Sequence, residues 1–163
     1  MEQKLYDLLK ELNIEFEKFE HEPFFTCEES NEFYQKQKGK GGHFKTLFLR
    51  NKPKTRWVLA IVESHRKADL KALQNFLEES KNFSFGAPEY LKEKLGLTPG
   101  SVTPFGLIHP NAGDLEVVVD EGLLEHDFVH FHPLRNTATL RLSKENFLKF
   151  LESRGNTIRF YPF

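Results

Sequence analysis

Residues 97–106 form the segment whose residue types could do chemistry most readily. The sequence LTPGSVTPFG sets two prolines and two glycines around small polar residues. Proline fixes φ and glycine lets a ligand approach the backbone, so the amides of residues 100–103 could point at a carbonyl or carboxylate. A plain connection between a helix and a strand is the alternative, and this segment taken alone favours it.

Histidines are the second group with chemical potential. His130 and His132 alternate along an expected strand, so both could point to one face of a sheet. With His109 or His126 they could chelate a metal ion, but no Glu or Cys at helical spacing completes a standard motif, and we expect no metal site. The sequence also lacks a G-x-S-x-G turn, a Walker loop and a dinucleotide fingerprint. Covalent nucleophilic catalysis and a bound cofactor are therefore not expected.

Composition limits the class of protein. The length of 163 residues suits one domain, residues 1–163, since no repeat or low-complexity linker divides the chain. Cys27 is the single cysteine, which excludes an intramolecular disulfide and favours a reducing compartment. The charged, helix-periodic N-terminal residues lack the features of a signal peptide or a membrane span. We therefore expect a cytoplasmic protein that makes no membrane contact.

Apolar periodicity and capping residues predict the elements that position these groups. The expected helices are Leu5–Leu12, a short helix from Thr26, Leu70–Leu77 capped by Asp69, Glu89–Leu95 started by Pro88 and ended by Gly96, and a helix capped by Ser143 and stopped by Gly155. The expected strands are Ile14–Phe19, Thr46–Leu49, Trp57–Val62, Phe105–Ile108, Leu115–Val119, Phe128–Phe131, Thr137–Leu142 and Thr157–Tyr161. The second and third of these strands should form a β-hairpin. The expected fold is α/β (α+β), with a mixed central β-sheet flanked by helices.

Four segments, in order along the chain, resemble the prolyl-tRNA synthetase-associated editing domains, the YbaK-like superfamily. They are Lys45–Leu49, Leu70–Leu73, Leu95–Leu107 and Phe131–Thr137. The third includes a G-x-x-x-P pattern and the fourth an H-P-L-x-N pattern, and an ordered set of this kind is more specific than one short motif. The chain is similar to free-standing deacylases of the PrdX and ProXp-ala type, which remove alanine from mischarged proline tRNA in trans.

The resemblance implies hydrolysis of an aminoacyl ester. Such an ester is already activated, so the enzyme must mainly position a water, polarise the carbonyl and hold the terminal adenosine. The implied catalytic residues are Lys45 at the 3′ end of the tRNA, Gly100 in the loop that holds the aminoacyl group, and His132, which orients the substrate or a water. A packed, hydrogen-bonded histidine is the alternative for His132. The implied substrate-binding residues are Thr46, Ser101, Val102, Thr103, Pro104, Phe131 and Asn136. For Asn136 we favour a structural role, in which it fixes its loop through backbone hydrogen bonds.

Charge is unevenly distributed along the chain. The net charge is −1, yet residues 36–56 contain eight Lys or Arg and no acid, so one surface should be locally basic. The resemblance implies that this surface holds the acceptor stem of a tRNA. The candidate tRNA-binding residues are Lys36, Lys38, Lys40, Arg50 and Lys52, and a solvated surface is an equal alternative for each. Prolyl-tRNA synthetase is a further candidate partner.

The exact substrate stays open in the sequence. Relatives that act on alanyl-tRNA(Pro) commonly have Asn where this chain has Thr46, and His109-Pro110-Asn111 replaces the usual Asn-Asp. The leading hypothesis is removal of alanine. Removal of serine, threonine or cysteine is a second, a tRNA- or synthetase-binding module without turnover a third, and a metal-dependent small-molecule hydrolase a fourth.

Overall fold

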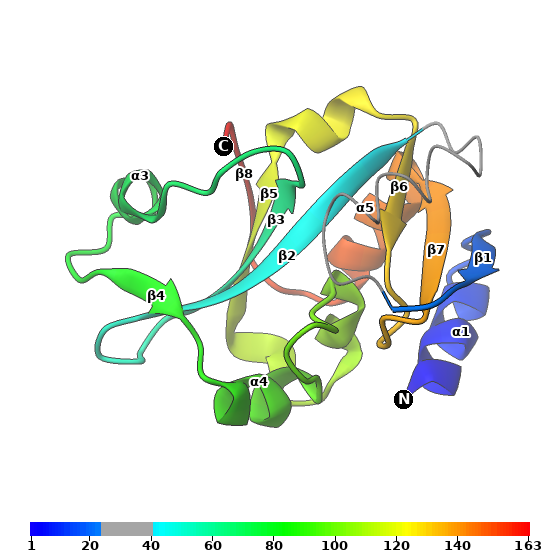
Figure 1. Cartoon of the computed structure of the whole chain (residues 1–163), viewed down its shortest axis with the longest axis horizontal. Helices are drawn as coiled ribbons and strands as arrows, with labels where there is room; N and C mark the ends of the chain where they lie inside the picture. Colours follow the sequence, from blue (N-terminus) through cyan, green and yellow to red (C-terminus); the bar gives the residue numbers. More distant parts are fainter. Residues whose placement is uncertain (24–40) are drawn as a thin grey trace.

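The computed structural model describes residues 1–23 and 41–163 (Figure 1). Within these residues the centre is a mixed sheet in which seven strands follow the order β1-β7-β6-β2-β3-β5-β8 and β4 adds to β2. The strands are β1 (Glu17–Glu20), β2 (Gly42–Asn51), β3 (Trp57–Glu63), β4 (Phe83–Phe85), β5 (Leu115–Asp120), β6 (Phe128–Phe131), β7 (Ala138–Ser143) and β8 (Ile158–Tyr161). β2 with β6, β3 with β5 and β5 with β8 are parallel pairs. The mixed central sheet is thus confirmed, whereas Thr26, Cys27, Lys36, Lys38 and Lys40 lie outside the described residues.

Helices cover both faces of this sheet. They are α1 (Glu2–Glu11), α3 (Leu70–Phe76), α4 (Pro88–Leu95), α5 (Lys144–Ser153) and the 3₁₀ helices η1 (Pro104–Ile108), η2 (Ala112–Asp114) and η3 (Glu121–Glu125). Side chains of α1, α4 and α5 pack with one face of the sheet in a large core, and α3 packs with the other face in a smaller core. In the described ranges, no helix has the length and apolar character needed to cross a membrane.

Three helix ends form as the sequence predicts. The Asp69 carboxylate accepts hydrogen bonds from the first-turn amides of α3, and Ser143 Oγ accepts one from the amide of Asn146 at 3.1 Å. Gly96 ends α4 in the left-handed region at φ 68°. These local signals confirm the starts of α3 and α5 and the end of α4.

The strand expected at Phe105–Ile108 is wrong. These residues lie in the 3₁₀ helix η1, because Pro104 supplies a helical φ at its first position and Thr103 accepts a hydrogen bond from the amide of Phe105 at 3.4 Å. Residues 104–107 are all buried, so the run has no polar alternation that would separate a strand from a helix.

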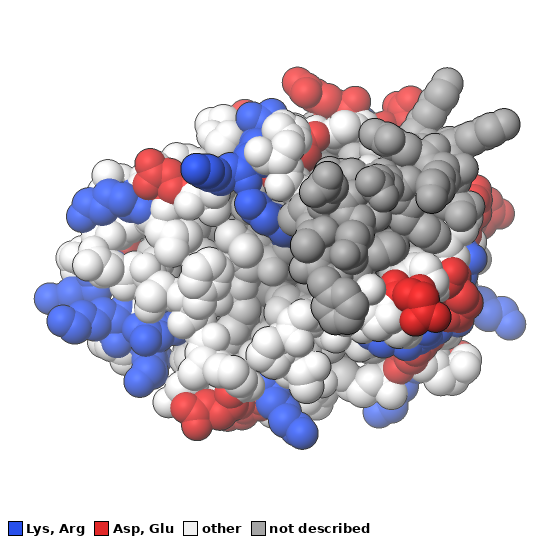
Figure 2. All heavy atoms as spheres, viewed as in Figure 1, with Lys and Arg blue, Asp and Glu red and all other residues white. Residues whose placement is uncertain are grey.

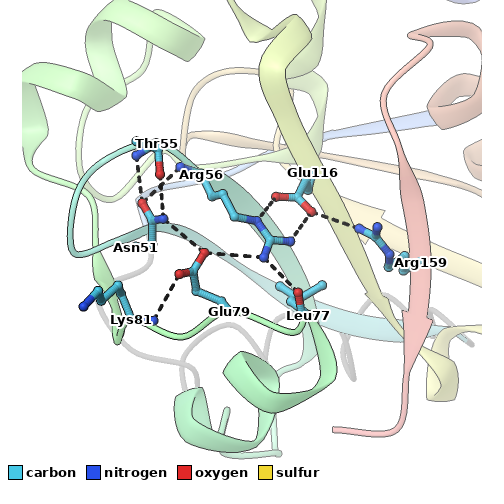
Figure 3. A network of polar contacts seen from close by, with 8 residues as sticks. All are labelled: Asn51, Thr55, Arg56, Leu77, Glu79, Lys81, Glu116 and Arg159. Carbon is cyan, nitrogen blue, oxygen red and sulfur yellow. Dashed lines mark hydrogen bonds and ion pairs between the residues drawn. The ribbon is translucent and has the colours of Figure 1, made fainter.

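The hairpin of β2 and β3 is confirmed, and a polar network holds its turn (Figure 3). The Arg56 guanidinium donates to both carboxylate oxygens of Glu116, at 2.9 and 2.6 Å, and to the carbonyl of Leu77 at 2.8 Å. Asn51 Oδ1 accepts from the amides of Thr55 and Arg56 at 2.8 and 3.0 Å. A bidentate arginine pair of this kind fixes orientation as well as distance, so this end of the hairpin is firmly anchored.

Candidate functional site

One edge of β2 is only partly paired. Its other edge pairs with β3 along seven residues, but on this side β6 pairs only with Gly42 and His43, and β4 only with residues 49–51. The carbonyl of His43 accepts from the amide of Ser64, so the odd-numbered residues of β2 bond to β3 and the even-numbered ones face the other edge. The amide and carbonyl of Thr46 therefore lie on an edge that no described strand covers at this point.

A small cavity of about 50 Å³ lies where β2 and β6 part. Its lining comes from β2, the end of β3, the loop before η1, and β6 with the residue after it. The lining residues are His43, Phe44, Thr46, Ser64, Val102, Thr103, His130, Phe131 and His132. Diverging neighbours in a sheet commonly leave a crevice that binds ligands. The structure thus brings together Thr46, Val102, Thr103, Phe131 and His132, all predicted from the sequence.

The loop before η1 contributes Val102 and Thr103 to the lining of this cavity. The amide of Ser101 donates to the carbonyl of Thr98 at 3.0 Å, whereas the amides of Val102 and Thr103 make no hydrogen bond within the described residues. Thr103 itself is 1% exposed, and its hydroxyl donates to the backbone carbonyl of His132 at 2.7 Å. Two adjacent amides on an anchored loop are suited to stabilise a developing negative charge.

The histidines of the cavity are neutral at physiological pH. Burial lowers the pKa of His43 and that of His130 to about 4, and burial also lowers the pKa of His132. The Nδ1 atoms of His130 and His132 lie 3.2 and 3.1 Å from the carbonyls of Gly42 and Ala138. A carbonyl only accepts, so in both rings Nδ1–H donates and Nε2 carries the lone pair. The Nε2 of His132 can therefore accept a proton or a hydrogen bond.

Sequence reasoning missed part of this lining. His43, Phe44 and Ser64 were not singled out, and His130 was considered only as a metal ligand. The alternation of His130 and His132 did correctly place both side chains on one cavity. The local sequence does not indicate that His43 and Ser64 line a cavity. Their positions there depend on the β2–β3 register and on the parallel pairing of β2 with β6.

Lys45 lies on the opposite face of β2 from Thr46. Leu47 and Leu49 belong to the smaller core and Phe48 to the larger one, so alternation puts Lys45 on the α3 side of the sheet. Its Nζ donates to the backbone carbonyl of Arg66. Lys45 thus flanks the cavity without lining it.

Four other predicted site residues lie outside the cavity lining. Gly100 is exposed, has φ 91°, and has open space where a Cβ would sit. Ser101 is half-buried in the same loop, and Pro104 is buried at the start of η1. Asn136 is half-buried, and its side chain makes no hydrogen bond within the described residues. Their substrate-binding and positioning roles stay predictions.

A neighbouring arginine anchors the loop that contains Asn136. Arg135 donates to Glu2 and Glu20 at 2.8 and 2.7 Å, which ties this loop to α1 and β1. These contacts lower the pKa of Glu20 to about 2, with the hydrogen bond from Arg135 as the largest cause. Arg135, which the sequence analysis did not single out, therefore anchors the segment after His132 to α1 and β1.

Basic side chains gather at the end of the molecule that holds the β2–β3 turn (Figures 1 and 2). Lys52 is exposed in that turn, and Arg50 is half-buried at the end of β2, with Nη1 3.4 Å from the carbonyl of Asn51. At about 3.3 Å per strand residue, Lys52 lies on the order of 20 Å from Lys45 along the hairpin. The turn is thus separate from the cavity.

The remaining histidines have other partners. His109 Nδ1 accepts from the amide of Asn111 at 3.1 Å, and His126 Nε2 bonds to Glu63. Across residues 1–23 and 41–163, no three His, Cys, Asp or Glu side chains form a group that could hold a metal ion.

Comparison with known proteins identifies the family. The model of the aminoacyl-tRNA editing domain matches residues 21–150, and the chain therefore belongs to this family. It is an ester hydrolase of the aminoacyl-tRNA deacylase class. The family resemblance seen in the four sequence segments is thus confirmed.

Two relatives and one solved structure are similar to the chain over nearly its whole length. It is 34% identical over 151 residues to the prolyl-tRNA editing protein ProX of Acetoanaerobium sticklandii, covering 93% of this chain and 90% of ProX. It is 37% identical over 156 residues to the mouse prolyl-tRNA synthetase associated domain-containing protein 1, covering 94% and 90%. The crystal structure of a proposed trans-editing enzyme for prolyl tRNA synthetase matches with a TM-score of 0.71 at 17% identity, covering 98% and 94%, which supports the fold.

Proposed function

We propose that this protein hydrolyses the alanyl ester of mischarged proline tRNA, alanyl-tRNA(Pro). The observation that most directly supports this proposal is the cavity where β2 and β6 part, which has a volume of about 50 Å³. A single water needs about 10–15 Å³ of such space, so the cavity has room for a methyl group and a water but not for a large side chain. Steric exclusion of this kind separates alanine from larger residues.

The arrangement of polar groups supports water attack on the ester. The amides of Val102 and Thr103 would stabilise the oxyanion, and the amide or carbonyl of Thr46, which no described strand pairs with on this edge, would orient the aminoacyl group. His132 Nε2 would accept a hydrogen bond or a proton from the attacking water. The water oxygen bonds to the carbonyl carbon, the ester C–O bond breaks, and the ribose oxygen leaves with a proton. The products are alanine and uncharged tRNA.

The tRNA itself would bind along the hairpin. Lys45 uses one of its three donors on Arg66, which leaves two for the 3′ end of the tRNA. The basic side chains at the β2–β3 turn, including Arg50 and Lys52, would contact phosphates of the acceptor stem. The names of the relatives support proline tRNA as the substrate and prolyl-tRNA synthetase as a partner. A protein with these partners would work in the cytoplasm.

Serine is a second candidate for the amino acid removed. The side chains of Thr46, Ser64 and Thr103 bring hydroxyl groups to the cavity lining. A hydroxymethyl group could hydrogen-bond to such a lining, and a pocket rejects a small hydroxyl poorly by size alone. Threonine and cysteine are further candidates for the amino acid removed.

Release of labelled amino acid tests the proposal. We expect wild-type protein to release alanine from alanyl-tRNA(Pro) and to spare prolyl-tRNA(Pro), and Lys45→Ala to lower kcat/KM about tenfold or more. Lys149→Ala, at an exposed lysine of α5, is the matched control. Seryl-, threonyl- and cysteinyl-tRNA complete the panel. Faster release of one of these would move the assignment to that amino acid, and tRNA binding without any release would support a binding module.

A further inference from the structure

A second polar cluster joins the ends of β3 and β5 to the loop between β3 and α3. Arg66 lies at its centre. Its Nε is 3.2 Å from Glu63 Oε2 and 3.5 Å from Asp120 Oδ2, and its backbone carbonyl accepts the hydrogen bond from Lys45 Nζ. Arg66 thus contacts two carboxylates through its side chain and Lys45 through its backbone.

The two carboxylates are themselves held in place. Glu63 is 7% exposed and Asp120 is 1% exposed. Asp120 accepts from the amides of Glu63 and Gly122 at 3.0 and 2.9 Å, and the second oxygen of Glu63 bonds to His126. Burial raises the pKa of Glu63, but the hydrogen bonds from His126 and Arg66 outweigh it and lower the pKa overall. Glu63 is therefore a carboxylate at neutral pH and attracts the Arg66 guanidinium.

We propose that Arg66 is a positioning residue for Lys45, an inference that rests on the proposed function. The Arg66 side chain fixes the loop to Glu63 and Asp120, and the carbonyl of Arg66 then holds the Lys45 ammonium. A free lysine side chain loses about 2 kcal/mol of rotamer entropy when it is ordered. In this protein the Lys45 side chain is ordered before the tRNA binds. Its two remaining N–H donors are therefore already oriented toward the tRNA.

Arg56 provides a matched control at the other end of the hairpin. It is also a partly buried arginine with two carboxylate partners, Glu116 and Glu79 (Figure 3). Within the described residues, its side chain makes no hydrogen bond to Lys45. A loss of general stability should follow from removal of either arginine, whereas a change at Lys45 should follow only from removal of Arg66.

The first test is a double-mutant cycle on deacylation, with melting temperatures measured in parallel. We expect Arg66→Ala to lower kcat/KM about tenfold in the wild-type background. In the Lys45→Ala background, we expect Arg66→Ala to lower kcat/KM no further. Arg56→Ala should show no coupling to Lys45→Ala. Equal losses from Arg66→Ala in both backgrounds would overturn the proposal. If Arg66→Ala does not fold at the assay temperature, Arg66→Lys replaces it, because it keeps the charge and removes the forked geometry.

The second test does not depend on deacylation. Acetic anhydride at limiting concentration acetylates lysines according to their accessibility, and mass spectrometry compares Lys45 with the exposed Lys52. We expect Lys45 to react several-fold more slowly than Lys52 in wild type and in Arg56→Ala, and at a similar rate to Lys52 in Arg66→Ala. An unchanged Lys45 rate in Arg66→Ala would overturn the proposal. Failure of wild type to release any amino acid would instead overturn the proposed function, and the acetylation result would still decide whether Arg66 orders Lys45.

Discussion

The hydroxyl of Thr103 donates a 2.7 Å hydrogen bond to the backbone carbonyl of His132. This bond joins the loop before η1 to the end of β6, the two segments that carry the expected oxyanion donors and the expected base. Thr103 also accepts from the amide of Phe105, so one side chain sets both the start of η1 and the distance between loop and strand.

Replacement of Thr103 by valine tests this link. Thr103→Val keeps the shape but removes the donor, and we expect it to lower the free energy of unfolding by about 1–2 kcal/mol and to reduce kcat. Thr103→Ser, which keeps the hydroxyl, is the control. Chemical denaturation and single-turnover deacylation measure the two effects. Equal activity of the valine and serine variants would show that the bond does not position the site.

Val102 tests the size of the cavity. Val102→Ala removes two methyl groups from the lining, so larger aminoacyl groups should become substrates. We expect the ratio of kcat/KM for 2-aminobutyryl-tRNA to that for alanyl-tRNA to rise about tenfold, because one methylene is worth about 1–3 kcal/mol in such a pocket. Val102→Ile should change the ratio in the opposite direction. Unaltered ratios in both variants would show that the side chain of the aminoacyl group binds outside this cavity.

Two histidines of the cavity, His43 and His130, predict acid sensitivity. The pKa of His43 and that of His130 are about 4 in the folded protein, below the ordinary 6.5. The unfolded chain therefore binds more protons between about pH 6.5 and pH 4, so stability is full above this window and falls as the pH is lowered through it. We expect a loss of about 1–3 kcal/mol for each histidine. Denaturant titrations at stepped pH should show a shallower loss in His43→Asn than in His65→Asn, whose histidine is exposed.

Gly100 tests the loop backbone. Its φ of 91° is strained for any other residue, although a Cβ there would meet no atom within 4 Å. Gly100→Ala should therefore cost about 1–2 kcal/mol of stability through the backbone alone and should disturb the amides that follow. Gly113→Ala is the control, since a Cβ at Gly113 also meets nothing and no positive φ occurs there. Wild-type deacylation by Gly100→Ala would remove this glycine from the expected catalytic residues.

The β2–β3 turn tests the path of the tRNA. Lys52 and Lys54 are both exposed there. If each contacts a phosphate, replacing both with alanine should weaken tRNA binding and make the slope of log K against log salt shallower by about 1.4–1.8. Filter binding over a series of salt concentrations measures this slope, with Lys149→Ala as the reference. A slope equal to that of the reference would place the acceptor stem away from the turn.

The sequence predicts the elements well where the signal is local. Asp69, Ser143 and Gly96 mark helix ends through their own hydrogen bonds or backbone angle, and the apolar runs of β2 and β3 define the hairpin. β4 was missed because it has only three residues, and η1 was misread because a fully buried run has no periodicity. These errors lie in short elements that tertiary packing determines.

The site is less predictable for a different reason. Thr46 and Lys45 are adjacent in sequence and were assigned to one site, yet strand alternation puts them on opposite faces. His43 and His130 pair although about half of the chain separates them, and nothing local in the sequence encodes this pairing. The residues predicted at the cavity came from the family motifs, whereas the gap in the β2 edge is visible only in the fold.

That gap also bears on how the protein behaves at high concentration. Open strand edges are places where another chain can add, and they promote aggregation. Among the described residues, β6 pairs up to His43 and the carbonyl of Phe48 accepts from the amide of Gly86, so the run outside these pairs is residues 44–47, a length of about 13 Å. An incoming strand longer than this would collide with β6 or β4, whereas a single aminoacyl group would not. The strand can therefore expose backbone donors to a small substrate and still resist edge-to-edge association.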